Sequence, residues 1–290
     1  VTVRDENQLI DCSDVKVCNM KCLQLIIGPA GSGKSTYCSV MFNHFQALNR
    51  PLEIVNLDPA AETFNYTPSV DIRDLISVDD VLEDEDIIMG PNGGLVFCME
   101  YISKNMEWIR DQLTDGDEAY VIVDCPGQIE LYSHLPIMKE IVTTFKSWDY
   151  NVCTLFMIDA HFVLEPEKLI AGALTALSSM VSLETSAVNV LTKMDQLPRE
   201  DRKEVEDMLE SDCAQLMDGV SDEPWNERHA ALSRAIASVL DDYSMFKMVA
   251  LDNTDEESIE DLLLMIDTTI QYGEDAEVHD RIPEEVDPEE

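Results

Sequence analysis

A glycine-rich run near the start of the chain has the residue types and spacing of a loop that holds phosphate groups. Gly28–Ser35 has the sequence GPAGSGKS and fits the pattern G-x-x-x-x-G-K-[ST]. Gly31 and Gly33 allow the backbone to curl, so that successive N–H groups face phosphate oxygens, and a following helix adds its positive end. We expect Lys34 to reach the β- and γ-phosphates and the Ser35 hydroxyl to ligate Mg²⁺. The residues of this loop expected to bind a nucleotide are Gly31, Ser32, Gly33, Lys34, Ser35 and Thr36.

A carboxylate and a glycine with complementary chemistry follow a second apolar run. Asp124–Gly127 has the sequence DCPG and comes directly after the run 119–123. A carboxylate at the end of a strand, reached after a phosphate-binding loop, is the expected holder of Mg²⁺. Gly127 can bring its N–H against a γ-phosphate. D-x-x-G is common by itself, but its place in this order of motifs indicates a phosphate-sensing segment.

A third motif offers recognition of a base. Thr192–Asp195 has the sequence TKMD and closes the apolar run 187–191. The carboxylate of Asp195 can accept both N1–H and N2–H of guanine, a pair of donors that adenine lacks, and the stem of Lys193 would cover the base. Thr192 stands where Asn is commoner. The motif follows the other two in the proper order and therefore favours GTP over ATP, with Thr192, Lys193, Met194 and Asp195 as the expected contacts.

The elements that must position these motifs follow from an alternation of short apolar runs and longer amphipathic stretches. The runs predicted as strands are 23–27, 51–57, 119–123, 152–158, 187–191 and 246–251. The stretches predicted as helices are 33–48, 97–113, 128–146, 165–183, 200–217, 226–240 and 256–271. Strands separated by helices of this length predict an α/β domain with a parallel sheet covered on both faces.

The chain divides into one domain and two ends. We expect a nucleotide-binding domain over 21–272, with a long insertion at 58–96 that is too large to be a structureless loop without a function. Residues 1–20 form an extension without an initiator methionine, and its origin as a leader, an alternative exon or an added segment stays open. The prolines and like charges of 273–290 predict a disordered acidic tail.

The charge of the chain excludes some classes of partner. The sequence holds 59 acidic residues and 19 lysines and arginines, a net charge of −40. This argues against direct binding to nucleic acid or to an anionic membrane, because both carry the same sign.

We also expect no transmembrane helix and no secretory signal. None of the eight cysteines forms a CxxC pair, which favours reduced thiols in the cytosol or nucleus and disfavours a metal site on Cys12, Cys18 and Cys22.

Taken together, these motifs resemble the GPN-loop GTPases, a family within the SIMIBI class of P-loop proteins. The resemblance covers about residues 21–272. It is carried by Gly28–Thr36, Asn56–Ala60, Asp71–Asp74, Gly90–Asn92 (GPN, inside the long insertion), Asp124–Glu130 and Thr192–Asp195.

The resemblance implies a fold and a reaction. The expected fold is a three-layer P-loop NTPase with a mostly parallel central sheet, the GPN insertion and a helical, lid-like insertion at 198–245. Members hydrolyse GTP with Mg²⁺ as dimers in which the GPN loop of one subunit enters the active site of the other. Asn92 would then donate to the γ-phosphate region of its partner, an arrangement that suits a transition state with developing negative charge.

The resemblance also implies roles for residues outside the three motifs. Gln128 and Glu130 correspond to residues that place the attacking water, and Asp58 to a switch-region aspartate near Mg²⁺. The expected metal site is therefore Ser35, Asp124 and Asp58. From the residues alone, Asp58 could equally cap a turn and Glu130 could be a solvated helix residue.

Partners and location are likewise expectations from the resemblance. It implies a homodimer, or a heterodimer with a related GPN-loop GTPase, that works in the assembly and nuclear import of RNA polymerase II, with polymerase subunits as partners. The protein would then occur in both cytoplasm and nucleus.

Some alternatives stay open at the level of sequence. A P-loop kinase would need a lid of arginines, and Arg199, Arg202, Arg228 and Arg234 are scattered through the lid-like insertion. A scaffold that binds GTP without hydrolysing it is a third hypothesis. Met208, Leu209, Leu216 and Met217 have helical spacing and are better explained as the inner face of the insertion than as an exposed groove. Leu251–Asp255 lacks the Ser-Ala pair that often meets guanine O6, so that contact has no named residue.

Overall fold

A parallel sheet forms the centre of the molecule. The computed structural model describes residues 21–84, 88–114, 119–210, 227–242 and 248–271. Within them, all strand pairs of the seven-stranded sheet are parallel, in the order β3-β2-β4-β1-β5-β6-β7. The strands are β1 (Lys21–Ile27), β2 (Glu53–Asn56), β3 (Val70–Asp71), β4 (Tyr120–Asp124), β5 (Tyr150–Asp159), β6 (Ser186–Thr192) and β7 (Met248–Ala250). This confirms the expected α/β fold.

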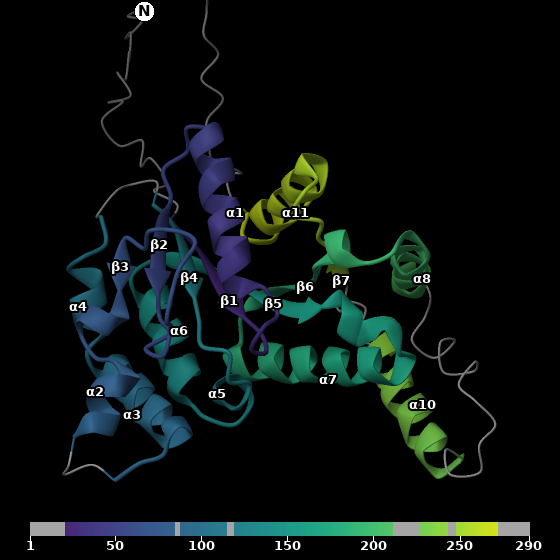
Figure 1. Cartoon of the computed structure of the whole chain (residues 1–290), viewed down its shortest axis with the longest axis horizontal. Helices are drawn as coiled ribbons and strands as arrows, with labels where there is room; N and C mark the ends of the chain where they lie inside the picture. Colours follow the sequence, from purple (N-terminus) through teal and green to yellow (C-terminus); the bar gives the residue numbers. More distant parts are fainter. Residues whose placement is uncertain (1–20, 85–87, 115–118, 211–226, 243–247, 272–290) are drawn as a thin grey trace, which may run out of the picture.

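Helices cover both faces of the sheet, which makes three layers. In Figure 1, α1 and α11 lie on one side of the strands, and α5, α6 and α7 lie on the other. The helices are α1 (Lys34–Ala47), α2 (Val78–Glu83), α3 (Pro91–Lys104), α4 (Met106–Arg110), α5 (Glu130–Ser133), α6 (Ile137–Ser147), α7 (Pro166–Leu183), α8 (Arg199–Glu210), α10 (Glu227–Asp242) and α11 (Glu256–Thr269). Short 3₁₀ helices are η2 (Ile72–Asp74), η3 (Ala160–Leu164) and η4 (Met194–Gln196).

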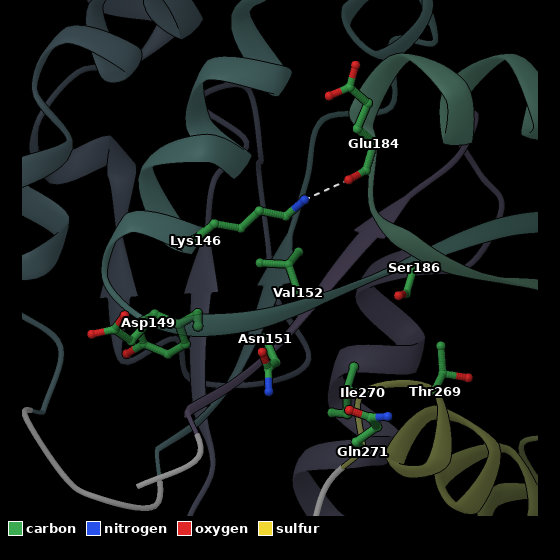
Figure 2. A pocket seen from close by; sticks show the side chains of 10 residues that line it. Lys146, Asp149, Asn151, Val152, Glu184, Ser186, Thr269, Ile270 and Gln271 are labelled. Atoms are coloured by element: carbon green, nitrogen blue, oxygen red, sulfur yellow. Dashed lines mark hydrogen bonds between the residues drawn. The ribbon is translucent and has the colours of Figure 1, made fainter. Parts of the chain in front are cut away.

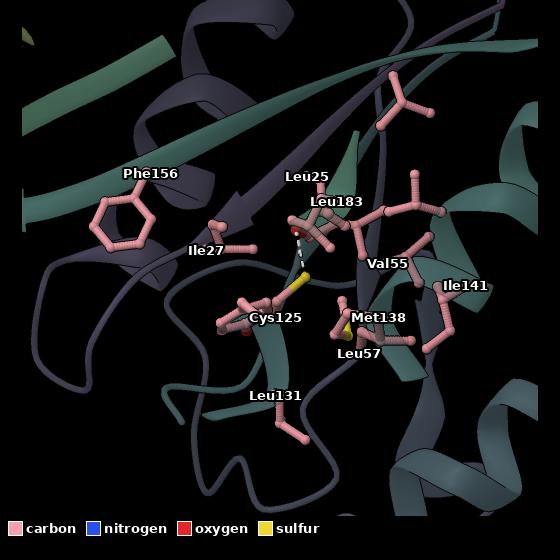
Figure 3. Close-up of a cluster of buried hydrophobic side chains, with 14 of the residues drawn as sticks. Leu25, Ile27, Val55, Leu57, Cys125, Leu131, Met138, Ile141, Phe156 and Leu183 are labelled. Atoms are coloured by element: carbon pink, nitrogen blue, oxygen red, sulfur yellow. Dashed lines mark hydrogen bonds between the residues drawn. The ribbon is translucent and has the colours of Figure 1, made fainter. Parts of the chain in front are cut away.

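The central strand β1 shows why its sequence is apolar at most positions, with Gln24 as the buried polar exception. Leu23 and Leu25 pack into the core under α6 and α7, whereas Cys22 and Ile26 pack into the core under α1 and α11. Successive side chains of a strand point to opposite faces, so a strand that is covered twice needs apolar residues at both parities. Figure 3 shows the first of these cores, with side chains from β1, β2 and β5 meeting those of α5 and α6.

Two predicted helices are each divided in the structure. The stretch predicted at 128–146 forms α5 and α6, because Pro136 has no N–H to donate and α6 starts directly after it. The stretch predicted at 97–113 is α3 followed by α4, with Asn105 between them. Helix α3 also begins earlier than predicted, at Pro91, a residue suited to the first turn.

The long insertion is more structured than its turn-rich composition suggests. It contains β3, η2, α2 and the first residues of α3. Strand β3 has only two residues, which is too short for an alternating pattern to be recognised. At the start of α2, Ser77 and Asp80 form a capping box that fixes the entry of that helix.

Several further expectations concern the surface and the cysteines. Among the described helices, none combines the length and apolarity needed to cross a bilayer. Cys22, Cys38, Cys98, Cys125 and Cys153 are buried free thiols, whereas Cys12, Cys18 and Cys213 lie outside the described residues. Met208 is buried and Leu209 packs beside it against the main core, as an inner face requires, while Leu216 and Met217 also lie outside the described residues.

Candidate functional site

The three sequence motifs meet at the carboxyl ends of the central strands. The phosphate-type loop follows β1, Asp124 ends β4, and Thr192 ends β6. Strand β1 pairs with β4 on one side and β5 on the other, which brings these ends to one edge of the sheet. Ligands of open parallel sheets bind outside the carboxyl ends of the strands. The candidate site is therefore the loop region above β1, β4, β5 and β6.

The glycine loop adopts backbone angles that its glycines make accessible. Gly28, Gly31 and Gly33 have φ values of 142°, 78° and 91°, in the left-handed half of conformational space. A Cβ atom on Gly28 would also collide with the carbonyl oxygen of Met157 on β5. Within the part of the chain that the structure describes, the Ser32 hydroxyl is buried and has no hydrogen-bond partner. A buried unpaired hydroxyl is costly, and a phosphate oxygen at this position would satisfy it.

Lys34 folds back over the same loop. Its Nζ atom donates to the carbonyl oxygens of Gly28 at 3.1 Å and Pro29 at 3.0 Å, and the side chain is only 8% exposed. Burial lowers the pKa of this ammonium, although the nearby Asp124 carboxylate acts in the opposite direction. The charged end thus lies above the curled backbone, where a β- or γ-phosphate would meet it.

Asp124 is the buried carboxylate of the site. It is 3% exposed and accepts a hydrogen bond from the Tyr66 hydroxyl at 2.8 Å, and the Ser35 hydroxyl lies close enough to affect its pKa. Burial raises the pKa of Asp124, and the two hydroxyls oppose this rise. A carboxylate paired with a P-loop hydroxyl offers the hard oxygen ligands that Mg²⁺ prefers, so the residues present fit that ion. In the described residues no cluster of three or more His, Cys, Asp or Glu side chains accompanies them, and substrate oxygens and water would complete the shell.

The segment after Asp124 lies directly against the glycine loop. A Cβ atom on Gly127 would approach Cα of Ala30 to 2.8 Å, closer than real Cβ contacts come. The hydroxyl of the buried Tyr132 donates to the carbonyl oxygen of Pro126 and fixes the turn from the other side. Only glycine allows this contact between the two motifs. Because the contact is so close, a movement of the glycine loop would also displace the backbone of Gly127.

The predicted base-recognition motif is bonded to the glycine loop as well. The Thr192 hydroxyl is 2.6 Å from the carbonyl oxygen of Ser32 and 3.2 Å from that of Ile158. A threonine in place of the commoner asparagine therefore still holds the loop. Asp195 is exposed in η4, where its carboxylate can receive a base, and Met194 is buried beneath it.

Lys193 is positioned by a residue that the sequence did not single out. Its backbone is left-handed, with φ of 63°, and its Nζ forms a 2.7 Å ion pair with Asp159 at the end of β5. Hydrogen bonds from Lys193 and His161 outweigh the effect of burial and lower the pKa of Asp159. The pair fixes the end of the Lys193 side chain, whose stem is expected to cover a base. Its signal in the sequence was an acid at the end of a strand, which alone has no specificity.

The loop after β7 lies beside this motif. The Met194 N–H donates to the carbonyl oxygen of Leu251 at 3.4 Å. Asp252 is buried and accepts from Thr254 and from Arg202 at 2.7 Å. Next to it, in the portion covered by the structure, Oδ1 of Asn253 is buried without a partner. The structure thus brings the loop that lacks a Ser-Ala pair to the base side of the site.

Two of the remaining predicted residues are bonded to each other. Gln128 and Asn92 are in contact: the Gln128 amide nitrogen donates to Oδ1 of Asn92 at 2.8 Å, from the loop before α5 to the first turn of α3. Asp58 caps a turn by accepting from the Ala60 N–H at 2.9 Å, and burial raises its pKa. Glu130 is exposed at the start of α5.

A separate cavity lies at the opposite end of the sheet. Its volume is about 530 Å³, and its lining includes Lys146, Asp149, Tyr150, Glu184, Ser186 and Gln271. Figure 2 shows it at the amino ends of β5 and β6, where Lys146 donates to the carbonyl oxygen of Glu184 at 2.6 Å. It contains none of the predicted nucleotide-binding residues and is not the candidate site.

Comparison with known proteins gives close relatives over most of the chain. A protein-family model described as "conserved hypothetical ATP binding protein" matches residues 26–272. GPN-loop GTPase 3 from Danio rerio is 50% identical over 266 residues, which cover 92% of this chain and 93% of that protein. GPN-loop GTPase 3 from Xenopus tropicalis is 48% identical over 254 residues, covering 88% of this chain and 89% of that protein.

A solved structure shares the architecture. The crystal structure of a GTPase in apo form from Pyrococcus abyssi superposes with a TM-score of 0.72 at 19% sequence identity. The match covers 87% of this chain and 98% of the archaeal chain. At this level of identity, the likeness supports the fold alone.

Proposed function

The chain belongs to the GPN-loop GTPase family and is a GTPase, and we propose that it uses Mg²⁺ for hydrolysis and works as a nucleotide-dependent switch. The observation that carries the proposal is the 2.6 Å hydrogen bond from Thr192 to the carbonyl oxygen of Ser32. It joins the base-recognition motif to the phosphate loop, so that a guanine and its phosphates would occupy one continuous site.

We propose a task in hydrolysis for each of these side chains. A water molecule attacks the γ-phosphorus, the bond to the oxygen that bridges the β- and γ-phosphates breaks, and GDP leaves with that electron pair. Gln128 can accept a hydrogen bond from the attacking water through Oε1, because its amide nitrogen is already bonded to Asn92, and the proton of the water passes to an oxygen of the phosphate that is released. The N–H group of Gly127 and the Lys34 ammonium supply donors to the oxygens that gain charge, and the amide of an Asn92, from the same chain or across an interface, adds a further donor. Bound Mg²⁺ would add positive charge beside the β- and γ-phosphates, held by Ser35 and Asp124.

We further propose that the protein acts as a dimer in which Asn92 serves the partner's active site. The GPN motif begins α3 on the surface, and the two residues before Gly90 are exposed apolar side chains: Ile88 is 98% exposed and Met89 44% exposed. Exposed apolar residues around a functional loop favour an interface. In the single chain, Asn92 contacts its own Gln128, so action in cis and action across an interface are distinguishable.

A complementation experiment tests the dimer. A Lys34→Ala chain, which lacks the phosphate-binding ammonium, is mixed with an Asn92→Ala chain, which lacks the GPN amide. If Asn92 acts across an interface, the mixture regains GTP hydrolysis, because one mixed site has both groups. Additive low rates in a mixture that demonstrably forms heterodimers would overturn action in trans.

We propose, from the family resemblance, a role in the assembly and nuclear import of RNA polymerase II, in the cytoplasm and nucleus. The net charge of −40 supports a role through contacts with proteins rather than with nucleic acid. The test is depletion of the protein, rescued with wild type or with Asn92→Ala, followed by imaging of the largest polymerase subunits. Cytoplasmic accumulation that only wild type reverses supports the role, and unchanged nuclear polymerase contradicts it.

The kinase alternative gains no support from the lid-like insertion. Arg202 on α8 is paired with Glu206 at 3.1 Å and with Asp252 at 2.7 Å, so its guanidinium is already engaged. Arg199 and Arg234 are exposed, and the side chain of Arg228 is outside the described residues. Radiolabelled γ-phosphate recovered entirely as inorganic phosphate, with or without small-molecule acceptors, separates hydrolysis from phosphate transfer.

A further inference from the structure

Tyr66 connects the loop between β2 and β3 to the carboxylate at the centre of the site. Its hydroxyl donates to Oδ2 of Asp124 at 2.8 Å, and its side chain is 7% exposed. The two residues are 58 positions apart in the sequence. Neither the glycine-loop pattern nor the D-x-x-G pattern includes an aromatic residue here, so this contact is a product of the fold.

The backbone of the same loop is anchored to Asp124 as well. The Leu57 N–H donates to the carbonyl oxygen of Asp124 at 2.8 Å, where the loop (residues 57–69) leaves β2. The Ser39 hydroxyl on α1 donates to the carbonyl oxygen of Asn65, directly before Tyr66, at 3.2 Å. The loop thus begins on the Asp124 backbone and returns to the Asp124 side chain.

A chain of contacts holds the Tyr66 ring in place. The Phe64 ring lies with its centroid 5.1 Å from that of Tyr66, and the guanidinium of Arg73 lies 4.6 Å from the centroid of Phe64. Arg73 also donates to the carbonyl oxygen of Ala61 at 2.9 Å and forms a 2.6 Å ion pair with Asp71. These contacts connect the loop, from Ala61 to Tyr66, to the hydroxyl that bonds Asp124.

The chemistry of an aspartate explains what this hydroxyl does. The terminal torsion of a carboxylate has broad, shallow minima, so the side chain does not orient itself. A donor fixed on Oδ2 restricts the rotation of the Asp124 carboxylate and leaves Oδ1 available to the Mg²⁺ that Asp124 and Ser35 would hold.

We propose that Tyr66 is a positioning residue, which orients Asp124 for the metal and couples metal binding to the conformation of residues 57–69. The inference rests on the proposed use of Mg²⁺. Without the hydroxyl, Asp124 remains buried but its carboxylate rotates more freely. Metal binding must then also restrict this rotation, which lowers the affinity for the metal. A hydrogen bond to a charged group corresponds to about a tenfold change in an equilibrium constant.

The test compares Tyr66→Phe with Tyr37→Phe in the full chain. Tyr37 is a matched control, because its hydroxyl is also buried and hydrogen-bonded, at 2.8 Å to Oε1 of Gln24. The release of a fluorescent GDP analogue is followed across a titration of free Mg²⁺, and hydrogen exchange of residues 57–69 is measured with GDP, with and without Mg²⁺. For Tyr66→Phe, we expect about a tenfold higher Mg²⁺ midpoint, unchanged release in EDTA, and loss of the Mg²⁺-dependent protection of the loop.

The outcomes separate the inference from the function on which it rests. A wild-type protein whose GDP release ignores Mg²⁺ contradicts the proposed metal. A Mg²⁺-dependent wild type with the same midpoint in Tyr66→Phe, or an equal shift in Tyr37→Phe, overturns the positioning role. Should Tyr66→Phe fail to fold, Phe64→Leu keeps the hydroxyl but loosens the ring, and a smaller shift in the same direction is expected; no shift there would refute the proposal.

Discussion

The Gln128 amide nitrogen lies 2.8 Å from Oδ1 of Asn92 and donates a hydrogen bond to it. One residue follows the D-x-x-G turn, and the other begins the helix that opens with the GPN motif. The bond orients both amides: the N–H groups of Asn92 remain donors for an anion, and Oε1 of Gln128 remains an acceptor for water. A motif from the long insertion is thus placed beside the residue expected to position water.

Replacement of Asn92 by alanine should impair catalysis more than binding. The change removes a donor for the charged phosphoryl group and also frees the amide of Gln128, so we expect kcat to fall by about 100-fold with little change in GTP affinity. Asn105→Ala, at the other end of α3, is the control, because its amide donates to the carbonyl oxygen of Tyr101 on the same helix. Single-turnover hydrolysis and equilibrium binding separate the two effects. A loss of affinity as large as the loss of rate would contradict a role in the transition state.

Replacement of Asp195 by asparagine should abolish the preference for guanine. The carboxylate would accept two hydrogen bonds from the base, and the amide cannot accept both, so GTP should lose about 100-fold of its advantage over ATP. Competition among GTP, GDP and ATP measures the preference, with Asp201→Asn on α8 as the same chemical change outside the site. An unchanged ranking of nucleotides would mean that the base binds elsewhere.

The bond from Thr192 to the glycine loop should matter for the nucleotide as well as for stability. Thr192→Val keeps the shape but leaves the carbonyl oxygen of Ser32 without its donor, at a cost of about 1–3 kcal/mol in the free energy of unfolding. Thr154→Val removes another buried hydroxyl, which pairs with Thr185 at 2.6 Å away from the site. Urea unfolding should show losses for both variants, whereas only Thr192→Val should bind GTP more weakly. Equal binding by the two would show that the tether is purely structural.

The Asp71–Arg73 pair should add to stability in a defined pH range. Burial acts to raise the pKa of Asp71, but hydrogen bonds from Arg73 and Asn56 outweigh it, and the pKa lies below its ordinary value of 3.8. A carboxyl whose pKa is lowered by folding stabilises the protein above the unfolded pKa, and this contribution disappears as the pH falls through the folded value. We expect Asp71→Asn to be less stable at pH 7 and to lose less stability below about pH 4. Urea midpoints between pH 7 and 3 measure this, and parallel pH profiles of the two proteins would be inconsistent with it.

The principal features of the fold follow from local patterns. The runs around Leu23–Ile27 and 119–123 have both parities buried, so predominantly apolar sequence was a sufficient signal for β1 and β4. Element boundaries were less predictable. Pro136 divides a helix whose pattern looked continuous, and the two-residue β3 has no pattern of its own.

The residues of the candidate site likewise include some that the sequence could locate and some that it could not. Gly28–Ser35, Asp124 and Asp195 could be located because the order of three motifs fixes them to strand ends that a parallel sheet brings together. Tyr66 and Asp159 could not be located, since a tyrosine in an insertion and an acid after a strand are ordinary residues until their partners are known. Their roles come from contacts with Asp124 and Lys193 across 58 and 34 positions of chain.

The sequence by itself determined the kind of chemistry, because backbone curling at glycines, the charge of a lysine and the acceptors of a carboxylate are local properties of residues in a short motif. The tertiary structure decided how those groups are oriented. The plane of Asp124, the tether from Thr192 to Ser32 and the pairing of Asn92 with Gln128 each depend on a hydrogen bond between distant segments. Such a bond needs a distance near 3 Å and a suitable angle, and only the packing of the helices against the sheet sets these.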